Sequence, residues 1–287
     1  MVAVTTLIEV TVDGIAFGLF LTLLGVGITL VYGLGEVLNL AIGMFAIVAV
    51  LIASALTNGG VDLLVAALAG VGAVGVLSLV VDRSLFTLVY RSEGEQRILL
   101  GIFVTLGLTV FLEGVLFNVF PSRYSLPVDL GTVGVGPVSL ASSSLAIIAV
   151  SAAVLALLFT FLERTFLGRA TRTVFQDETG ALLVGVDPRR IRTLVFVLSA
   201  VVAAVAGLVY ASSATIEVAS GFEFTVFALI VSIVGGVRSV TGAIGAGVLL
   251  GLVITYANFF IGSFIANMIL FATAVVVLLV KPGAISL

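Results

Sequence analysis

The chain has 287 residues, of which 61% are hydrophobic and only 9% are charged, whereas an ordinary soluble domain has about 25% charged residues. So little polar surface cannot cover a soluble fold, and the composition therefore predicts a polytopic membrane protein. The absence of cysteine and histidine excludes disulfides, thiolate metal sites and histidine-based catalysis. The net charge of -3 indicates little about partners when much of the surface faces lipid.

Apolar segments follow one another along almost the whole chain. A membrane-spanning helix needs roughly 20 mostly apolar residues. Hydropathy predicts nine such segments, at 14–32, 37–56, 62–81, 98–120, 143–162, 193–213, 223–237, 242–260 and 264–281. The junctions near 33–36 and 235–242 are short enough for tight turns or re-entrant breaks, in which case eight or seven full spans remain. We therefore expect an all-α integral membrane helix bundle of eight to nine segments, forming one domain over 1–287.

Basic residues predict how the bundle is oriented, because cytoplasmic loops of membrane proteins are enriched in Lys and Arg. If segments 82–97 and 163–192 are cytoplasmic, eleven of the twelve basic residues lie inside and only Arg123 lies outside. The N-terminus, which carries Glu9 and Asp13 and has no basic region typical of a cleaved signal peptide, is then external. The C-terminus is cytoplasmic if all nine segments cross. We expect a multi-pass protein of the plasma membrane.

Few residues within the spans carry chemistry. Glu36 and Glu113 lie within or at the edge of the spans, where a carboxylate is costly and faces an interior, water or a partner charge. They line a translocation path, or else Glu36 sits at the membrane surface and Glu113 pairs structurally. Every Asp is expected in a loop or a terminus. We predict no catalytic residue, no metal site and no cofactor, since the chain lacks a Gly-x-x-x-x-Gly-Lys-Ser/Thr phosphate loop and any base beside its serines.

Glycines at four-residue spacing predict close helix packing. The patterns of closely spaced glycines include Gly14-x-x-x-Gly18, Gly70-x-Gly72-x-x-Gly75 and Gly247-x-x-x-Gly251. This spacing is common in membrane proteins, and it indicates packing rather than a particular function.

Three motifs in order resemble the LivH-type branched-chain amino acid ABC transporter permease family. The first is YGLGEVLNLAIG at 32–43, the second is the central loop with Arg169, Asp177, Ala181 and Gly185 followed by LSAVVAAVAGLVYA at 198–211, and the third is GGVRSVTGA at 235–243. The C-terminal Lys281-Pro282 echoes the family's basic end. Relatives often carry His-Gly-Glu where this chain has Ile42-Gly43-Met44, and Gly and Pro where Arg238 and Thr241 stand.

The resemblance implies a permease subunit of an ABC importer for branched-chain or related small amino acids. Its partners are a second permease subunit in a hetero- or homodimer, two cytoplasmic ATP-binding subunits, an external solute-binding protein and membrane lipid, with no nucleic acid. The alternatives are a self-sufficient secondary transporter or channel, an ABC permease for urea or short amides, and a scaffold protein without solute flux. ATP hydrolysis is expected on the partners, so the chain itself is not an enzyme.

The loop 163–192 carries six of the twelve basic residues, and the resemblance implies that it couples the spans to the ATPase. Candidate coupling residues are Arg169, Arg172, Asp177, Ala181 and Gly185. An apolar contact with the ATPase is expected from Val174, Phe175, Leu182 and Leu183, which lie near one helix face. The simpler interpretation is a positively charged loop with no docking role, its flanking arginines merely holding it inside.

Candidate residues of the solute path are Glu36, Asn39, Gly43, Ser239 and Thr241. The Asn39 amide can hydrogen-bond a zwitterionic solute, or the free backbone of a broken helix. An interhelical hydrogen bond that holds the bundle is an equal alternative. Ser239 and Thr241, set between glycines, admit the same interpretations.

Overall fold

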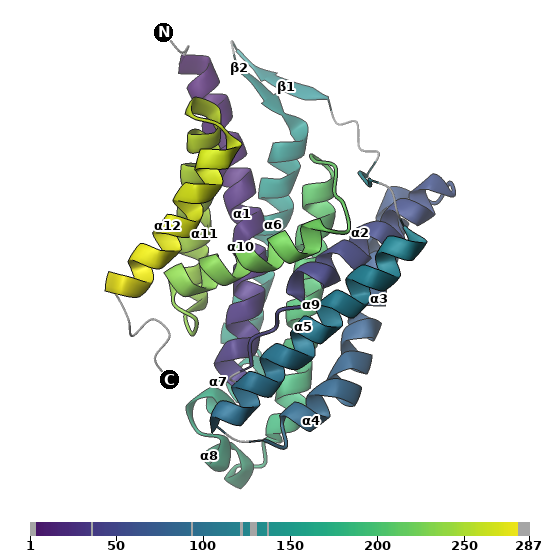
Figure 1. Cartoon of the computed structure of the whole chain (residues 1–287), viewed down its shortest axis with the longest axis vertical. Helices are drawn as coiled ribbons and strands as arrows, with labels where there is room; N and C mark the ends of the chain where they lie inside the picture. Colours follow the sequence, from purple (N-terminus) through teal and green to yellow (C-terminus); the bar gives the residue numbers. More distant parts are fainter. Residues whose placement is uncertain are drawn as a thin grey trace.

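A computed structural model describes residues 4–35, 37–92, 94–120, 123–126, 131–136 and 138–280. The chain folds into a helix bundle with one small β-hairpin (Figure 1). Glu36, Lys281 and Pro282 lie outside the described residues, as does the side chain of Phe175. The elements are α1 (Val4–Gly35), α2 (Ile42–Asn58), α3 (Leu63–Val81), the π-helical turn η1 (Asp82–Phe86), α4 (Thr87–Val89), α5 (Gly94–Val119), β1 (Thr132–Val135), β2 (Val138–Ala141), α6 (Ser142–Arg164), α7 (Phe166–Gln176), α8 (Glu178–Leu183), α9 (Pro188–Ala211), α10 (Ser220–Gly235), α11 (Val240–Phe260) and α12 (Ser263–Val280).

Each of the nine predicted segments forms a helix, but the helices fall into two length classes. Within the described residues, seven helices are long and apolar enough to cross a membrane: α1, α3 with its continuation to Val89, α5, α6, α9, α11 and α12. The other two, α2 and α10, have 17 and 16 residues. At 1.5 Å per residue they reach only about 24–26 Å, less than the roughly 30 Å of a hydrocarbon core. Figure 1 shows α10 lying across the long axis of the bundle.

Helix α1 is the centre of the bundle. It packs against α6, α9, α10 and α11, and side chains all around it are buried, as expected of a helix that is apolar on every face. The two predicted glycine pairs meet here: a Cβ on Gly18 would lie 2.8 Å from the Cα of Val248, and one on Gly251 would lie 2.8 Å from the carbonyl oxygen of Gly14. The predicted close packing is therefore confirmed, with α1 and α11 as the partners.

The third helical run extends further than predicted. The expected loop at 82–97 is helical as far as Val89, because α3 continues through the π-helical turn into α4. Asp82, expected in a loop, is thus a buried residue of a helix. Asp13, expected near a terminus, likewise lies within α1. Hydropathy missed both because a single carboxylate lowers the local average without ending a helix.

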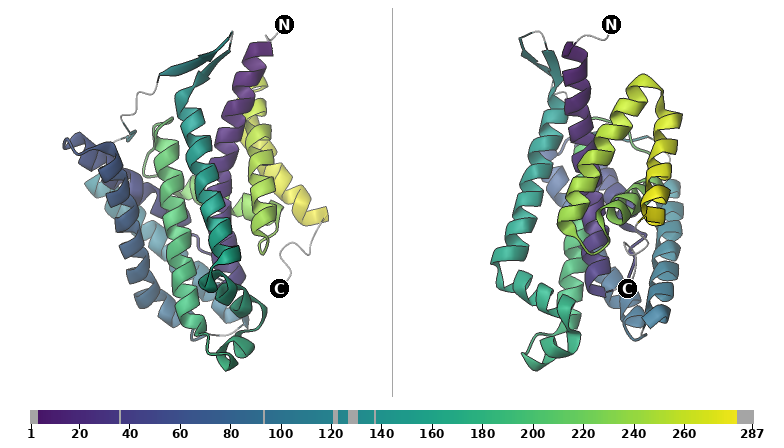
Figure 2. Two further views of the ribbon diagram at one scale, coloured as in Figure 1. Left: turned by 180° about the vertical axis from the view of Figure 1, so that it is seen from behind. Right: turned by 90° about the vertical axis from the view of Figure 1, so that its left-hand side faces the viewer.

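A β-hairpin lies at the end of the molecule where α1 begins (Figure 1). Its antiparallel strands β1 and β2 pair with Thr132 opposite Ala141. The hairpin departs from the expected all-α fold. Glu9 of α1 accepts hydrogen bonds from the backbone and hydroxyl of Ser139, at 3.0 and 3.1 Å. These bonds tie the hairpin to the start of the central helix. Figure 2 shows α7 and α8 at the opposite end.

Candidate functional site

The chain between α1 and α2 is irregular yet buried. Val37, Asn39 and Ala41 are fully buried, so the carbonyl groups of this break must find partners inside the protein. Two hydroxyls on the buried face of α5 supply them. Thr105 donates to the Leu38 carbonyl at 3.1 Å and Thr109 to the Leu40 carbonyl at 2.9 Å, each sharing its proton with a carbonyl of its own helix.

Asn39 stabilises the break from within. Its Oδ1 accepts from the backbone N–H of Ala41 at 3.1 Å, which is the local turn that asparagine favours. Its Nδ2 is completely buried and has no hydrogen-bond partner in the described part of the chain. Of the three roles expected for this amide, the structure contains the bond to the broken backbone, and one donor group has no partner among the described residues.

Gly43 allows two helices to cross. A Cβ at this position would collide with the carbonyl of Gly221 at the start of α10. Its N–H donates to the Thr225 hydroxyl at 3.1 Å. The glycine thus brings the N-terminal ends of the two short helices together, which is a packing role that its place in the motif did not reveal.

A cavity of about 190 Å³ lies beside the break. It is lined by Tyr32, Leu38, Ile98, Leu229, Ser232, Ile233 and Val237, from α1, α5, α10 and their connections. It is mostly apolar and lies between the two predicted re-entrant junctions. Neither Ser239 nor Thr241 lines it.

The second junction, between α10 and α11, is a tight glycine turn. Gly236 has φ +92°, a conformation that favours glycine, and a Cβ on Gly235 would lie 2.5 Å from the backbone N of Ala243. Ser239 caps α11 by accepting from the Gly242 N–H at 3.0 Å, and its hydroxyl lies 3.3 Å from that of Thr241. Ser239 therefore has a structural role in starting the helix.

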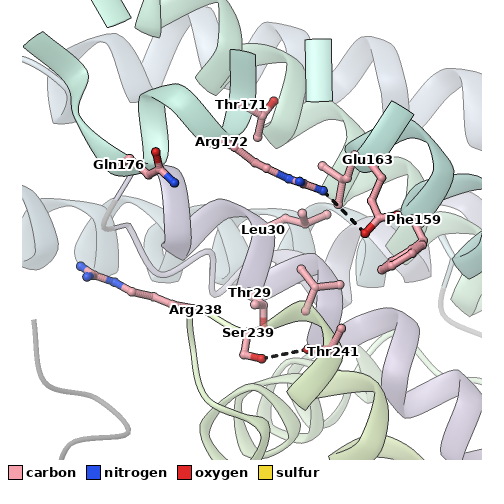
Figure 3. Close-up of a pocket in the computed structure, with 12 residues that line it drawn as sticks. Thr29, Leu30, Phe159, Glu163, Thr171, Arg172, Gln176, Arg238, Ser239 and Thr241 are labelled. Carbon is pink, nitrogen blue, oxygen red and sulfur yellow. Dashed lines mark hydrogen bonds and ion pairs between the residues drawn. The ribbon is translucent and has the colours of Figure 1, made fainter. Parts of the chain in front are cut away.

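A larger cavity of about 480 Å³ joins the two predicted groups of residues (Figure 3). Ser239 and Thr241, predicted for the solute path, line it together with Arg172, predicted for coupling. The other lining residues are Thr29, Leu30, Phe159, Leu162, Glu163, Thr171, Gln176, Arg238 and Val240. The guanidinium of Arg172 lies 3.9 Å from the Glu163 carboxylate. Asn39 and Gly43 do not line this cavity.

The predicted coupling loop consists of two short helices, α7 and α8, rather than one. Asp177 caps α8 by accepting from the Thr179 N–H at 2.9 Å, Ala181 is buried beneath it, and Gly185 ends it with φ +79°. The Val186 N–H bonds the Ala181 carbonyl at 2.9 Å, as in a Schellman motif. These three predicted residues shape the turn. The Arg169 side chain is exposed and forms no ion pair among the described residues.

The apolar set expected to contact an ATPase divides into two. Val174 is buried against the bundle, because the apolar stripe of α7 faces inward, and it is not available to a partner. Leu182, Leu183 and Val184 stand at the tip of the segment, and Leu183 is 85% exposed. This exposed apolar tip at the end of α8 is unusual for a surface that faces water.

Comparison with known proteins decides the family. Residues 10–280 match the family described as "Branched-chain amino acid transport system / permease component". The chain belongs to this permease family. It is 28% identical to the "High-affinity branched-chain amino acid transport system permease protein LivH" of Escherichia coli K12, over 95% of this chain and 93% of that protein. It is 26% identical to the corresponding protein BraD of Pseudomonas aeruginosa, over 96% and 94%.

A solved structure shares the fold of the permease. "PsaBC from Streptococcus pneumoniae in complex with Fab" superposes with a TM-score of 0.50 at 13% identity, covering 94% of this chain and 89% of that one. At this identity the likeness concerns the fold alone. Together with the seven long apolar helices, the family match makes this chain a multi-pass membrane protein.

Sequence reasoning missed one residue of the permease, Arg192. It was grouped with the arginines that flank the coupling loop, yet it is only 7% exposed. Its guanidinium donates to Glu178 of α8 at 2.5 Å and lies 4.9 Å above the ring of Tyr90. A signal existed in the spacing, since Arg192 lies four residues before the fully buried Phe196 and so shares its helix face.

A second polar contact ties the same end of the permease together. The Thr193 hydroxyl donates to Asp82 at 2.6 Å, and Arg189 donates to the Thr87 hydroxyl at 2.9 Å. These bonds join the start of α9 to the π-helical end of α3. Glu113 is half-buried on α5 and forms no hydrogen bond or ion pair with the described residues. No cluster of acidic residues suited to a metal ion occurs in the described part of the permease.

Proposed function

We propose that this permease is the membrane-spanning subunit of an ABC importer for branched-chain or related small amino acids, driven by ATP hydrolysed on partner subunits. The observation that carries the proposal is the exposed apolar tip of α8, which includes Leu183 and is carried by a compact two-helix segment. The chain has no nucleotide-binding loop of its own, and such a tip suits a groove on a soluble ATPase. The solute is inferred from the names of the relatives.

The charge distribution supports an orientation for the single domain. The α7–α8 segment carries the arginines of the central loop, whereas Arg123 pairs with Glu217 at 2.5 Å, next to the bridge between Tyr124 and Ile216. Arginine-rich ends of membrane proteins lie in the cytoplasm. We therefore place the segment 163–192 inside, the start of α1 outside and the C-terminus inside, in the plasma membrane.

The remaining partners follow from the family resemblance. A second permease subunit, identical or different, two ATP-binding subunits and an external solute-binding protein complete the importer. Helix α5 has a surface suited to the second subunit or to lipid, because it buries one face on the α1–α2 break and exposes the other. Phe103, Val110 and Phe111 lie on that exposed face.

The break between α1 and α2 is our candidate for the solute contact. The unused Nδ2 of Asn39 is a donor with no partner, and burying an unsatisfied donor costs about 1–3 kcal/mol. A solute carboxylate that reaches this donor when the break opens would relieve that cost. Asn39→Leu should then raise the KM for uptake, while the variant still assembles with its partners. If the asparagine is purely structural, the same variant should be less stable but have an unchanged KM.

The ATPase contact is tested by comparing two exposed apolar residues at opposite ends of the molecule. Leu183→Asn should weaken co-purification with the ATP-binding subunits and abolish stimulated ATP hydrolysis. Ile261→Asn, which changes a 57% exposed residue near the hairpin end, serves as the control and should leave both intact. Equal behaviour of the two variants would contradict docking through the tip of α8.

The energy source is tested by reconstituting the permease in liposomes with and without the ATPase and binding protein, using labelled amino acids, urea and short amides. Uptake should require both partners and ATP, and should favour branched-chain amino acids. Uptake by the permease alone, driven by an ion gradient, would instead support a secondary transporter or channel. Preference for urea or amides would support the other ABC substrate class, and no flux under any condition would support a scaffold.

A further inference from the structure

The larger cavity, at the α7 end of the bundle, combines charged, hydroxyl and apolar groups from four helices. Arg172 of α7 and Arg238 of the α10–α11 turn contribute guanidinium groups, and Ser239 and Thr241 contribute hydroxyls. In Figure 3 Arg172 lies on the opposite side of the cavity from Ser239 and Thr241, and the Arg238 side chain extends away from them at the cavity edge. Guanidinium and hydroxyl donors are the groups that bind phosphate in proteins.

Two of the helices that line the cavity, α6 and α11, also expose apolar side chains. Helices α6 and α11 both pack on α1, and among the described residues they make little contact with each other. Figure 2 shows α6 and α11 on either side of α1. Both helices expose apolar side chains, with Leu157 71% and Leu249 56% exposed. Acyl chains can lie against these exposed apolar side chains, with the headgroup at the cavity.

Arg172 is available for a ligand because its present contact is weak. Its carboxylate partner Glu163 is 3.9 Å away, and the side chains are 55% and 46% exposed. Exposed ion pairs at this distance contribute little to stability. A phosphate group carries more charge and more acceptor atoms than this loosely held carboxylate. The Arg172 guanidinium would therefore bind a phosphate more strongly than it binds Glu163.

We propose that this cavity binds the phosphate headgroup of an anionic phospholipid in the inner leaflet. The proposal rests on the orientation inferred under the proposed function, which puts α7 on the cytoplasmic side. Basic pockets between membrane helices on that side are suited to anionic headgroups. The apolar side chains of Leu30, Phe159 and Leu162 at the cavity then contact the glycerol and the first part of the acyl chains.

A lipid at this site would link two moving parts. Arg172 belongs to α7 of the coupling segment, whereas Ser239 and Thr241 belong to the α10–α11 turn beside the second helix break. One phosphate held by both elements would bridge them. Anionic lipid should therefore strengthen the transmission of motion from α7 into the bundle.

The binding test uses the purified full-length permease in detergent micelles and measures retained lipid by native mass spectrometry. Phosphatidylglycerol should be retained in preference to phosphatidylcholine. Arg172→Gln should reduce that preference about fivefold, and the double variant with Arg238→Gln about 25-fold, as expected for the loss of one and two arginines near a headgroup. Arg190→Gln, at an 88% exposed position outside the cavity, is the control and should leave the preference unchanged.

Each alternative to this lipid site gives a different result in the binding test. Equal loss of preference in the Arg190→Gln control, or no loss in the double variant, would overturn the site. Glycerol phosphate should not displace the lipid, because it lacks the acyl chains that contact the apolar side chains, and displacement by it would overturn the lipid assignment in favour of a free phosphate. Displacement by leucine would overturn it in favour of the solute. The measurement requires neither ATPase nor binding protein, so its outcome is independent of the transport test.

Discussion

Replacing Arg192 by glutamine should release α8 from the bundle. The change removes the 2.5 Å bond to Glu178 and the contact with the Tyr90 ring. A hydrogen bond involving a charged group contributes about 1.5–3 kcal/mol. The Tyr90 contact joins α9 to the end of α4 and is not broken when α8 opens, so it adds nothing to this loss. Because Glu178 is 44% exposed and solvent screens it, we expect a total loss of about 2 kcal/mol, which corresponds to roughly 30-fold more frequent local opening of α8.

Hydrogen–deuterium exchange of the segment 178–183 measures this opening directly. Exchange in Arg192→Gln should be about 30-fold faster, while helices α11 and α12, remote from the link, should exchange as in the parent. Arg190→Gln is the matched control, since Arg190 is 88% exposed and its one ion pair among the described residues is with Asp187, at 3.2 Å. Unchanged protection of α8 in Arg192→Gln would refute the reasoning and assign its anchoring to the buried Ala181 instead.

Two further predictions concern packing and the helix break. Gly251→Ala should destabilise the permease by about 1–3 kcal/mol, because its Cβ would meet the backbone of α1 at Gly18. The control is Gly245→Ala on the same helix, which should be neutral because nothing lies within 4 Å of that Cβ. Equal shifts of the melting temperature of the two variants in detergent would contradict this packing. Thr105→Val should cost about 1–2 kcal/mol, since it leaves a buried carbonyl of the α1–α2 break without its donor. Thr273→Val removes only a bond within its own helix and should change the melting temperature much less; a matching drop would show that the break does not depend on Thr105.

Most helix positions were predictable because hydropathy is a property of consecutive residues. A run of about 20 apolar residues must be helical in a bilayer, wherever it lies in the bundle. The two helix breaks were predictable from local sequence as well. Glycine leaves the helical conformation at a low free-energy cost, and glycines occur there at Gly33, Gly35, Gly235 and Gly236. Lengths were less predictable: α2 and α10 are shorter than full spans, and their N-terminal ends meet inside the bundle, where Gly43 contacts Gly221.

The roles of single residues were less predictable. Gly43 occurs in a motif that indicates function, and in the fold it allows α2 to cross α10. Asn39 could be expected at a broken helix, but only the structure shows which of its amide atoms is used. Such roles depend on which helix approaches from the side, and that neighbour is distant in the sequence.

The sequence alone determined that this protein spans a membrane, that its basic residues gather in one central segment, and that its motifs are those of a permease family. These features reside in composition, local periodicity and short runs of residues. Only the tertiary structure decided that Arg192 is a buried link to α8, and that Arg172 shares a cavity with Ser239 and Thr241. The physical reason is that a charge on a helix is solvated or buried according to which helices pack against that face, and such packing joins residues that are far apart in the chain.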